Sequence, residues 1–320
     1  MRILPKALSL LCGLLLAAAA IGADPVPPAA RWPAAVKSMM LGAAWAGERS
    51  VAVGERGVVL LTDPGQPPRQ AREVPLSLTL TATSFVDARR GWAVGHGGAI
   101  LASDDGGETW RVQRVDTDED RPLLAVHFFD AQQGVAAGLW SLLLVTDNGG
   151  QDWTPVTLPP PPGAKRADLN LTALFADRQG RLYATGERGM VLRSDDRGRH
   201  WRYLPTGYKG SLWSGIAPGP DGVLVVGGQR GSVFRSEDGG AHWRPVTVEG
   251  KSSITGFAAA AGELRAVGLD GFQATSRDAG RSFSTEWLPG RPTLTAIQLG
   301  ADGRQLLWGR TGLVTPAGPR

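Results

Sequence analysis

The sequence contains almost no cysteine, and its single cysteine lies close to the first residue. Cys12 is the only one in 320 residues, and it falls within an apolar run from Leu8 to Ala20. The run follows the basic residues Arg2 and Lys6 and precedes the small residue Ala23, so residues 1–23 are predicted to be a secretory signal peptide. The mature chain would be exported, to the periplasm or the cell exterior, without cysteine. Disulfides, thiol catalysis and cysteine-bound zinc are then excluded.

Long apolar runs and a strong excess of one charge are missing as well. The apolar run near the start is shorter than the roughly 20 residues that span a bilayer, and no later run approaches that length, so we expect no transmembrane anchor. Without Arg2 and Lys6 the chain has 32 basic and 30 acidic residues, a balance that gives no support to nucleic-acid binding. The four histidines show no His-Glu-x-x-His spacing. We expect no metal and no cofactor.

Glycine is abundant, with 44 residues, and it marks two repeated motifs. The first motif has a hydroxyl residue in position one, Asp or Asn in position three, Gly in position five and an aromatic residue in position eight. Such a pattern predicts a hairpin turn in which the Asp or Asn side chain accepts hydrogen bonds from nearby backbone amides and the aromatic ring packs inward. We assign these residues a structural role. Their five pairs are Asp105 and Trp110, Asn148 and Trp153, Asp196 and Trp201, Asp238 and Trp243, and Asp278 and Phe283.

The second motif is Gly-x-x-Gly, which occurs seven times if an imperfect copy at residues 138–141 is included. Six copies precede the hydroxyl residue that begins the next acidic turn by a constant eight residues, as Gly95 precedes Ser103. Successive first glycines are 41, 43, 48, 42, 40 and 41 residues apart. This period is typical of four-stranded propeller blades. The sequence therefore predicts an all-β, seven-bladed β-propeller over residues 24–320.

The second repeat illustrates the expected blade, with antiparallel strands at residues 80–85, 91–95, 99–103 and 109–114. The last repeat stops before a fourth strand. An unpaired edge is a liability that ring closure removes. We therefore predict that the leader at residues 24–37 supplies the closing strand, with Trp32 in the place that Trp110 or Trp243 has in its own blade.

The two motifs should lie at opposite ends of the channel. In a four-stranded antiparallel meander, the turn between the second and third strands emerges at the end opposite to the turn between the third and fourth. The Gly-x-x-Gly turns would then surround the channel mouth, where propellers commonly bind their partners. The predicted partner-binding residues are those inside these turns: Arg56, His96, Trp140, Arg188, Arg230, Asp270 and Arg310.

The acidic turns resemble the Asp-box, or BNR, repeats of sialidase-like propellers. The whole mature chain looks most like the photosystem II stability and assembly factor family, whose relatives also occur in bacteria without photosynthesis. The resemblance implies a non-catalytic binding or assembly factor, which uses an arginine-rich patch against a membrane or envelope protein. Arg56, Arg188 and Arg230 are the candidates for that patch, and an acidic segment of the partner is the expected ligand, because arginine binds carboxylates in a planar, bidentate way. We expect a monomer.

Three other interpretations stay open at this point. A sialidase-like glycoside hydrolase acting on an anionic sugar would use the same three arginines as a carboxylate clamp, with Tyr208 as nucleophile and Glu187 or Glu55 to activate it. An accessory adaptor of an envelope transport system would also be an exported binding protein. Alternatively, the arginines are solvated turn residues that pair with their neighbours, because turns at a protein surface are commonly charged.

Overall fold

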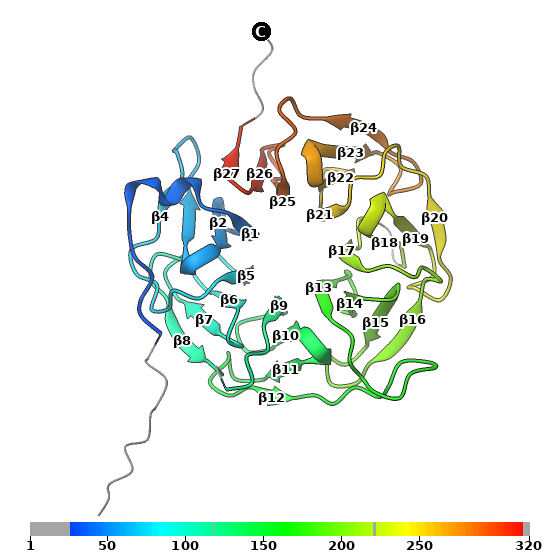
Figure 1. The fold of residues 1–320 in the computed structure, drawn as a ribbon, viewed down its shortest axis with the longest axis horizontal. Coiled ribbons are helices and arrows are strands. Elements are labelled where there is room, and N and C mark those ends of the chain that lie inside the picture. Colours follow the sequence, from blue (N-terminus) through cyan, green and yellow to red (C-terminus); the bar gives the residue numbers. More distant parts are fainter. Residues whose placement is uncertain (1–25, 117, 220–221, 316–320) are drawn as a thin grey trace, which may run out of the picture.

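The computed structural model describes residues 26–116, 118–219 and 222–315, in which seven antiparallel sheets surround a central channel (Figure 1). This arrangement confirms the predicted seven-bladed propeller. The predicted signal peptide and the first two residues of the leader lie outside the described residues. In each sheet the strand order follows the chain from the innermost strand outward.

The first three blades have four strands each. Blade 1 consists of β1 (Met40–Ala46), β2 (Arg49–Gly54), β3 (Val59–Thr62) and β4 (Arg69–Gln70). Blade 2 consists of β5 (Leu80–Phe85), β6 (Gly91–Gly95), β7 (Ile100–Ser103) and β8 (Arg111–Arg114), which lie within two residues of the predicted bounds. Blade 3 consists of β9 (Leu123–Phe128), β10 (Gly134–Gly138), β11 (Leu143–Thr146) and β12 (Thr154–Pro155).

The remaining blades repeat this pattern, except that the last has three strands among the described residues. Blade 4 consists of β13 (Leu171–Ala176), β14 (Leu182–Gly186), β15 (Met190–Ser194) and β16 (Arg202–Pro205). Blade 5 consists of β17 (Leu212–Ile216), β18 (Leu224–Gly228), β19 (Val233–Ser236) and β20 (Arg244–Val246). Blade 6 consists of β21 (Ile254–Ala260), β22 (Glu263–Gly268), β23 (Phe272–Ser276) and β24 (Ser284–Trp287). Blade 7 consists of β25 (Leu294–Leu299), β26 (Gln305–Gly309) and β27 (Gly312–Val314).

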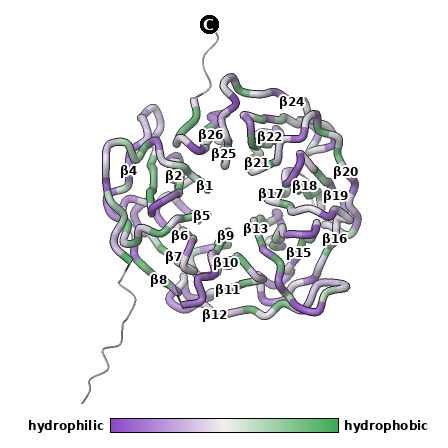
Figure 2. The backbone as a smooth tube through the Cα atoms, in the orientation of Figure 1, coloured by the Kyte–Doolittle hydropathy of each residue, from purple (hydrophilic) through white to green (hydrophobic). Residues whose placement is uncertain are grey.

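The hydrophobic core is divided among the junctions between blades. The described residues form seven hydrophobic clusters, and each cluster joins one blade to the next. Between blades 1 and 2, for example, Val51 and Leu61 pack with Leu101 and Trp110. Figure 2 shows the corresponding hydrophobic residues spread around the whole ring. Each blade is therefore stabilised by burial against both of its neighbours, as in other repeat architectures.

The prediction that an N-terminal strand closes the ring is wrong. The leader forms a short 3-10 helix, η1 (Pro33–Lys37), which packs against β27, and no leader strand pairs with the three strands of blade 7 within the described chain. Trp32 is not on a strand of blade 7: its backbone N–H donates to the Gln70 side chain in blade 1 at 3.2 Å, and its side chain packs against the hydrophobic cluster that contains the buried Trp308. Pro33 suits the first position of η1, where a backbone N–H would have no helical partner.

Candidate functional site

The Gly-x-x-Gly turns connect the second and third strands of each blade, and all seven are anchored in the same way. Four of them are one-turn 3-10 helices: η2 (Glu55–Gly57), η3 (Leu139–Ser141), η4 (Gln229–Gly231) and η5 (Leu269–Gly271). In every turn, the N–H of the residue after the first glycine donates to the carbonyl oxygen just before the innermost strand, over distances of 2.9–3.3 Å. The seven donor and acceptor pairs are Glu55 and Met39, His96 and Thr79, Leu139 and Pro122, Glu187 and Asn170, Gln229 and Ser211, Leu269 and Ser253, and Arg310 and Thr293. The turns therefore lie at the end of the channel where the innermost strands begin; we call them the mouth turns.

The first glycine of six mouth turns is required by a close approach of two backbones. A Cβ atom on Gly54 would lie 2.0 Å from the Met39 carbonyl oxygen, and one on Gly95 would lie 2.1 Å from that of Thr79. Carbon and oxygen atoms without a bond between them do not approach so closely. The recurrence of glycine in these six turns follows from the anchoring contact itself; in blade 4, a Cβ atom on Gly186 would lie 3.0 Å from the Asn170 oxygen, which is tight but no overlap.

The third residue of five mouth turns has a left-handed backbone conformation although it is not glycine. The φ angles are 55° for Arg56, 51° for Trp140, 56° for Arg188, 58° for Arg230 and 57° for Asp270. This conformation turns the side chain away from the blade, and all five side chains are exposed. Blade 2 has a glycine at this position, and its exposed residue is His96, one position earlier. In blade 7 the third residue is not left-handed, and both Arg310 and Thr311 are exposed.

The ring order separates the four mouth arginines into two pairs. Arg188 and Arg230 lie on the neighbouring blades 4 and 5, whereas Arg310 and Arg56 lie on blades 7 and 1, on the other side of the channel (Figure 1). Asp270 on blade 6 lies between the pairs on one side. His96 and Trp140, on blades 2 and 3, lie between them on the other. The sequence predicted all seven residues for one face, but it did not predict this division.

The acidic residues beside the arginines accept hydrogen bonds from residues just before the innermost strands. Glu55 accepts one from the Met39 N–H at 3.0 Å, and Glu187 accepts one from the Asn170 N–H and one from the Asn170 side-chain amide, each at 3.1 Å. These carboxylates therefore fix the mouth turns to the innermost strands instead of pairing with the adjacent arginines.

One mouth arginine has a partner of its own, because Arg188 forms an ion pair with Asp168 at 3.5 Å. Arg56, Arg230 and Arg310 form no ion pair within the described part of the chain. Three exposed guanidinium groups are thus available to a ligand at the mouth.

The residues considered for sialidase-like chemistry do not come together. The Tyr208 hydroxyl donates to the Gln229 carbonyl oxygen at 3.0 Å, and its ring packs near Phe234. Glu55 is held by the Met39 N–H, and Glu187 by the backbone and side-chain amides of Asn170, so neither carboxylate activates Tyr208. The three arginines of the proposed clamp are divided across the channel. The geometry lacks the contact between nucleophile and base that this chemistry requires.

The Asp-boxes connect the third and fourth strands and so lie on the face opposite to the mouth turns. In the first, the Ser103 hydroxyl accepts the Gly107 N–H at 2.9 Å, Asp105 accepts the Thr109 N–H at 2.9 Å, and the Trp110 indole donates to the Gly107 carbonyl. The other four boxes repeat the hydroxyl and Asp or Asn contacts.

These turns also perturb the acidity of their carboxyl groups. The backbone N–H of His242, which donates to Asp238, lowers the pKa of that carboxyl to about 2. In the last box, the Ser282 hydroxyl and N–H lower the pKa of Asp278 further. Each carboxylate accepts hydrogen bonds from donors within its own turn, so these side chains stabilise the turn itself.

Comparisons with known proteins agree with this architecture. The sequence model of the photosynthesis system II assembly factor YCF48 family matches residues 65–225. The chain belongs to the YCF48 family. Two solved structures share the fold. The first, described as YCF48 bound to D1 peptide, has a TM-score of 0.71 and 16% sequence identity, and the match covers 90% of this chain and 98% of that chain. The second, YCF48 from Cyanidioschyzon merolae, has a TM-score of 0.69 and 17% sequence identity, and the match covers 89% of this chain and 96% of that chain. No curated protein sequence matches.

One feature of this YCF48-family propeller was not predicted from its sequence. A shallow cavity of about 570 Å³ lies beside Arg56, with walls formed by Pro27, Pro28, Ala30 and Trp32 of the leader and by Ser77. The leader is fixed there by the Ala29 N–H, which donates to the Val74 carbonyl, and by the Ser77 N–H, which donates to that of Pro27. The prolines and the tryptophan of the leader could have indicated an apolar surface, but the sequence gives no sign that Arg56 lies next to it.

No helix among the described residues is long and apolar enough to cross a bilayer. No group of three or more His, Cys, Asp or Glu side chains in this part of the chain converges in the manner of metal ligands.

Proposed function

We propose that this propeller is a non-catalytic binding and assembly factor for a membrane or envelope protein, and that it receives an acidic segment of this partner at the mouth turns. The observation that carries the proposal is the set of exposed guanidinium groups of Arg56, Arg230 and Arg310, which have no carboxylate partner within the described chain. Membership of the YCF48 family supports an assembly role, and a protein of the same fold was solved with a bound peptide.

The chemistry of the mouth favours an extended acidic segment over a single carboxylate. Two pairs of arginines on opposite sides of a channel can bind carboxylates that are well separated along a peptide, each through planar, charge-assisted hydrogen bonds. Electrostatic attraction would also speed the encounter with an acidic partner.

Trp140 adds an apolar contact to this surface. Its side chain is 56% exposed. Although it is a bulky residue, Trp140 has a left-handed backbone conformation with φ 51°, at a position where blade 2 has a glycine. Strained backbone of this kind tends to be retained at functional sites. Tryptophan and arginine are also the residues most enriched at the energetic centres of protein interfaces. The expected partner segment therefore combines acidic residues with at least one large apolar residue.

The location of this interaction is part of the proposal. The predicted signal peptide at residues 1–23 would bring the propeller to the periplasm or the cell exterior. The partner would then be a membrane or envelope protein with an acidic segment on that side of the membrane.

Capture of the partner by arginine variants tests the proposal. Wild-type protein and the triple variant Arg56→Ala, Arg188→Ala and Arg230→Ala would be used to purify partners from the native envelope, with the captured proteins quantified by mass spectrometry. A matched control replaces three exposed arginines outside the mouth, Arg111, Arg202 and Arg277, with alanine.

We expect the mouth variant to lose the partner and the control to keep it, with the melting temperature of both close to that of wild type. If the folded mouth variant captures the same partner as well as the control does, the mouth is not the binding site.

A further inference from the structure

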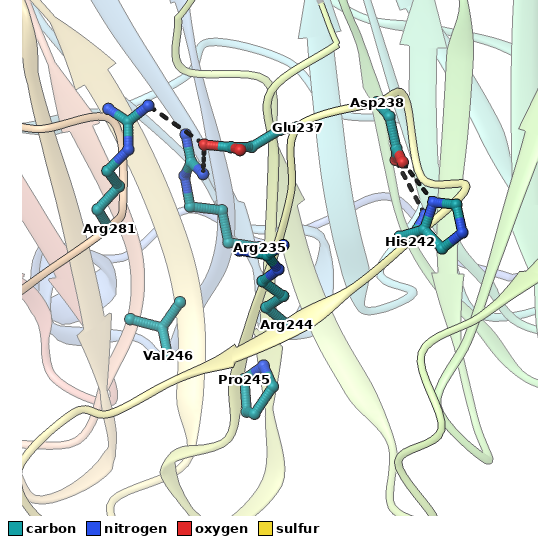
Figure 3. A pocket seen from close by; sticks show the side chains of 8 residues that line it. All are labelled: Arg235, Glu237, Asp238, His242, Arg244, Pro245, Val246 and Arg281. Atoms are coloured by element: carbon teal, nitrogen blue, oxygen red, sulfur yellow. Dashed lines mark hydrogen bonds and ion pairs between the residues drawn. The ribbon is translucent and has the colours of Figure 1, made fainter.

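A second cavity lies on the Asp-box side of the propeller, between the outer parts of blades 5 and 6. Its volume is about 360 Å³. Figure 3 shows its lining side chains, which come from β19, β20 and the two Asp-boxes of these blades. The residues that matter for its chemistry are Arg235, Glu237, His242, Arg244, Val246 and Arg281.

Positive charge exceeds negative charge around this cavity. Arg235 and Arg244 are directly opposite one another on β19 and β20, an arrangement of like charges that destabilises a sheet. Glu237 binds Arg235 and also accepts a hydrogen bond from Arg281 at 3.2 Å. Arg244 has no ion pair within the described chain. Three guanidinium groups thus lie around one carboxylate. Asp238, whose carboxylate contacts His242, also lines the cavity, so three guanidinium groups face two carboxylates and one positive charge is in excess.

One of these guanidinium groups is buried with an unused donor. Arg235 is 7% exposed; its Nε donates to the Ala279 carbonyl at 2.8 Å and its Nη1 to Glu237. Its Nη2 is buried and has no hydrogen-bond partner among the described residues. A buried donor that carries charge and has no acceptor is costly, by more than the roughly 1–3 kcal/mol of a neutral group. The arrangement lacks an acceptor.

The neighbouring blade provides an internal reference for this site. In blade 4, Arg193 and Arg202 are likewise directly opposite one another, on β15 and β16. The Asp195 carboxylate forms an ion pair with each of these arginines, at 2.7 Å from the Nε of Arg193 and 3.7 Å from the Nη2 of Arg202. The position of Arg281 is taken there by Ala241, and Arg181, the third arginine near Asp195, is paired with Asp177. Each arginine of the blade 4 group therefore has a carboxylate partner, whereas in blade 5 Arg244 has none among the described residues.

From these observations we infer that the cavity between blades 5 and 6 binds an oxyanion, as a free phosphate or as the phosphate group of a small monoester. Such an anion supplies negative charge and the several acceptor oxygens that the Nη2 of Arg235 and the guanidinium group of Arg244 lack within the described chain, in the fork geometry that guanidinium groups favour. The cavity volume lies at the lower end of the range for small-molecule sites and exceeds the space that phosphate alone would fill. The site is on the face opposite to the mouth turns, so it is independent of the proposed partner site.

Calorimetric titrations test the inference. Inorganic phosphate, sulfate and glycerol 3-phosphate would be titrated into the purified protein at pH 8 and constant ionic strength, with chloride as the reference anion. The variants are Arg244→Gln and Arg281→Gln, both at exposed positions, and the matched control is Arg202→Gln in blade 4. Melting temperatures without phosphate would establish that all three variants are folded.

We expect wild type and Arg202→Gln to bind phosphate and sulfate with one-to-one saturation. Arg244→Gln and Arg281→Gln should each bind at least about tenfold more weakly, the loss expected for one hydrogen bond to a charged group. Tighter binding of glycerol 3-phosphate than of phosphate would identify a monoester as the ligand; equal binding would identify the free ion. Absence of saturable binding by wild type, or equal weakening by all three variants, would overturn the inference.

Discussion

The left-handed residues of the mouth turns allow partner binding to be separated from stability. We predict that replacing Arg56, Arg188 and Arg230 together with glycine makes the propeller more stable, whereas replacing them with alanine does not. Their φ angles of 55°, 56° and 58° are almost the same as the 62° of Gly97, the residue in the corresponding position of blade 2. Glycine therefore fits this turn without rearrangement.

The size of the effect follows from two opposing contributions. A left-handed conformation costs an L-residue roughly 1–2 kcal/mol, and glycine avoids that cost. Glycine also loses more backbone entropy on folding, roughly 0.5–1 kcal/mol. The net gain is then about 0.5–1 kcal/mol for each site, or about 2 kcal/mol for the three, which would raise the melting temperature of a domain of this size by about 4 °C. Alanine keeps the strained backbone and gains nothing.

Differential scanning calorimetry of the wild type and both triple variants measures their melting temperatures, which should be highest for the glycine variant. Both variants lack the guanidinium groups, so both should fail to capture the partner to the same extent. A glycine variant that melts no higher than the alanine variant would show that the left-handed turns are not strained, and the reasoning would fail.

Two further predictions concern stability. Burial lowers the pKa of His127 from 6.5 to about 4. Below pH 6.5 the unfolded chain therefore binds a proton that the folded chain binds only near pH 4. The free energy of unfolding should fall by up to roughly 3 kcal/mol as the pH is lowered from 6.5 to 4. Urea unfolding at pH 7 and pH 4.5 should show this decline in wild type, and a decline of the same size in His127→Gln would exclude His127 as its cause. Gly95→Ala should cost about 1–3 kcal/mol because its Cβ would meet the Thr79 oxygen at 2.1 Å, whereas Gly219→Ala, whose nearest contact is an ordinary 3.4 Å, should be nearly neutral; equal melting temperatures for the two would contradict this account.

The repeat spacing predicted the fold because each motif has a local physical cause. The first glycine of a mouth turn is required by the backbone contact that anchors it, as at Gly54, and the Asp-box depends on hydrogen bonds within eight residues, as at Asp105. Both constraints act inside one blade, so they recur at the same positions in each. Antiparallel order then assigns the two motifs to opposite faces without further information.

Features that depend on contacts between distant segments could not be predicted in this way. The conformation of the leader depends on packing against β27 and Trp308, which are nearly 280 residues away along the chain. The cavity between blades 5 and 6 arises because Arg281 of one Asp-box adjoins Arg235 and Glu237 of the previous blade. The sequence shows that these arginines belong to their repeats, but not that they are neighbours in the folded protein.

Ring closure explains how the mouth residues are held in place. The Thr295 hydroxyl in blade 7 donates to the Met40 carbonyl of blade 1 at 2.6 Å, and Thr81, Thr172 and Thr255 donate to the next innermost strand in the same way. The closing junction thus repeats a contact used elsewhere in the ring and needs no additional strand.

Each mouth turn is hydrogen-bonded to the start of an innermost strand, and four pairs of neighbouring innermost strands are joined by these threonines. The exposed side chains of the mouth are therefore carried by a connected frame instead of by independent loops. A ligand that bridges the arginines on opposite sides of the channel would then have little backbone ordering to oppose its binding, since the frame is already fixed before the ligand arrives.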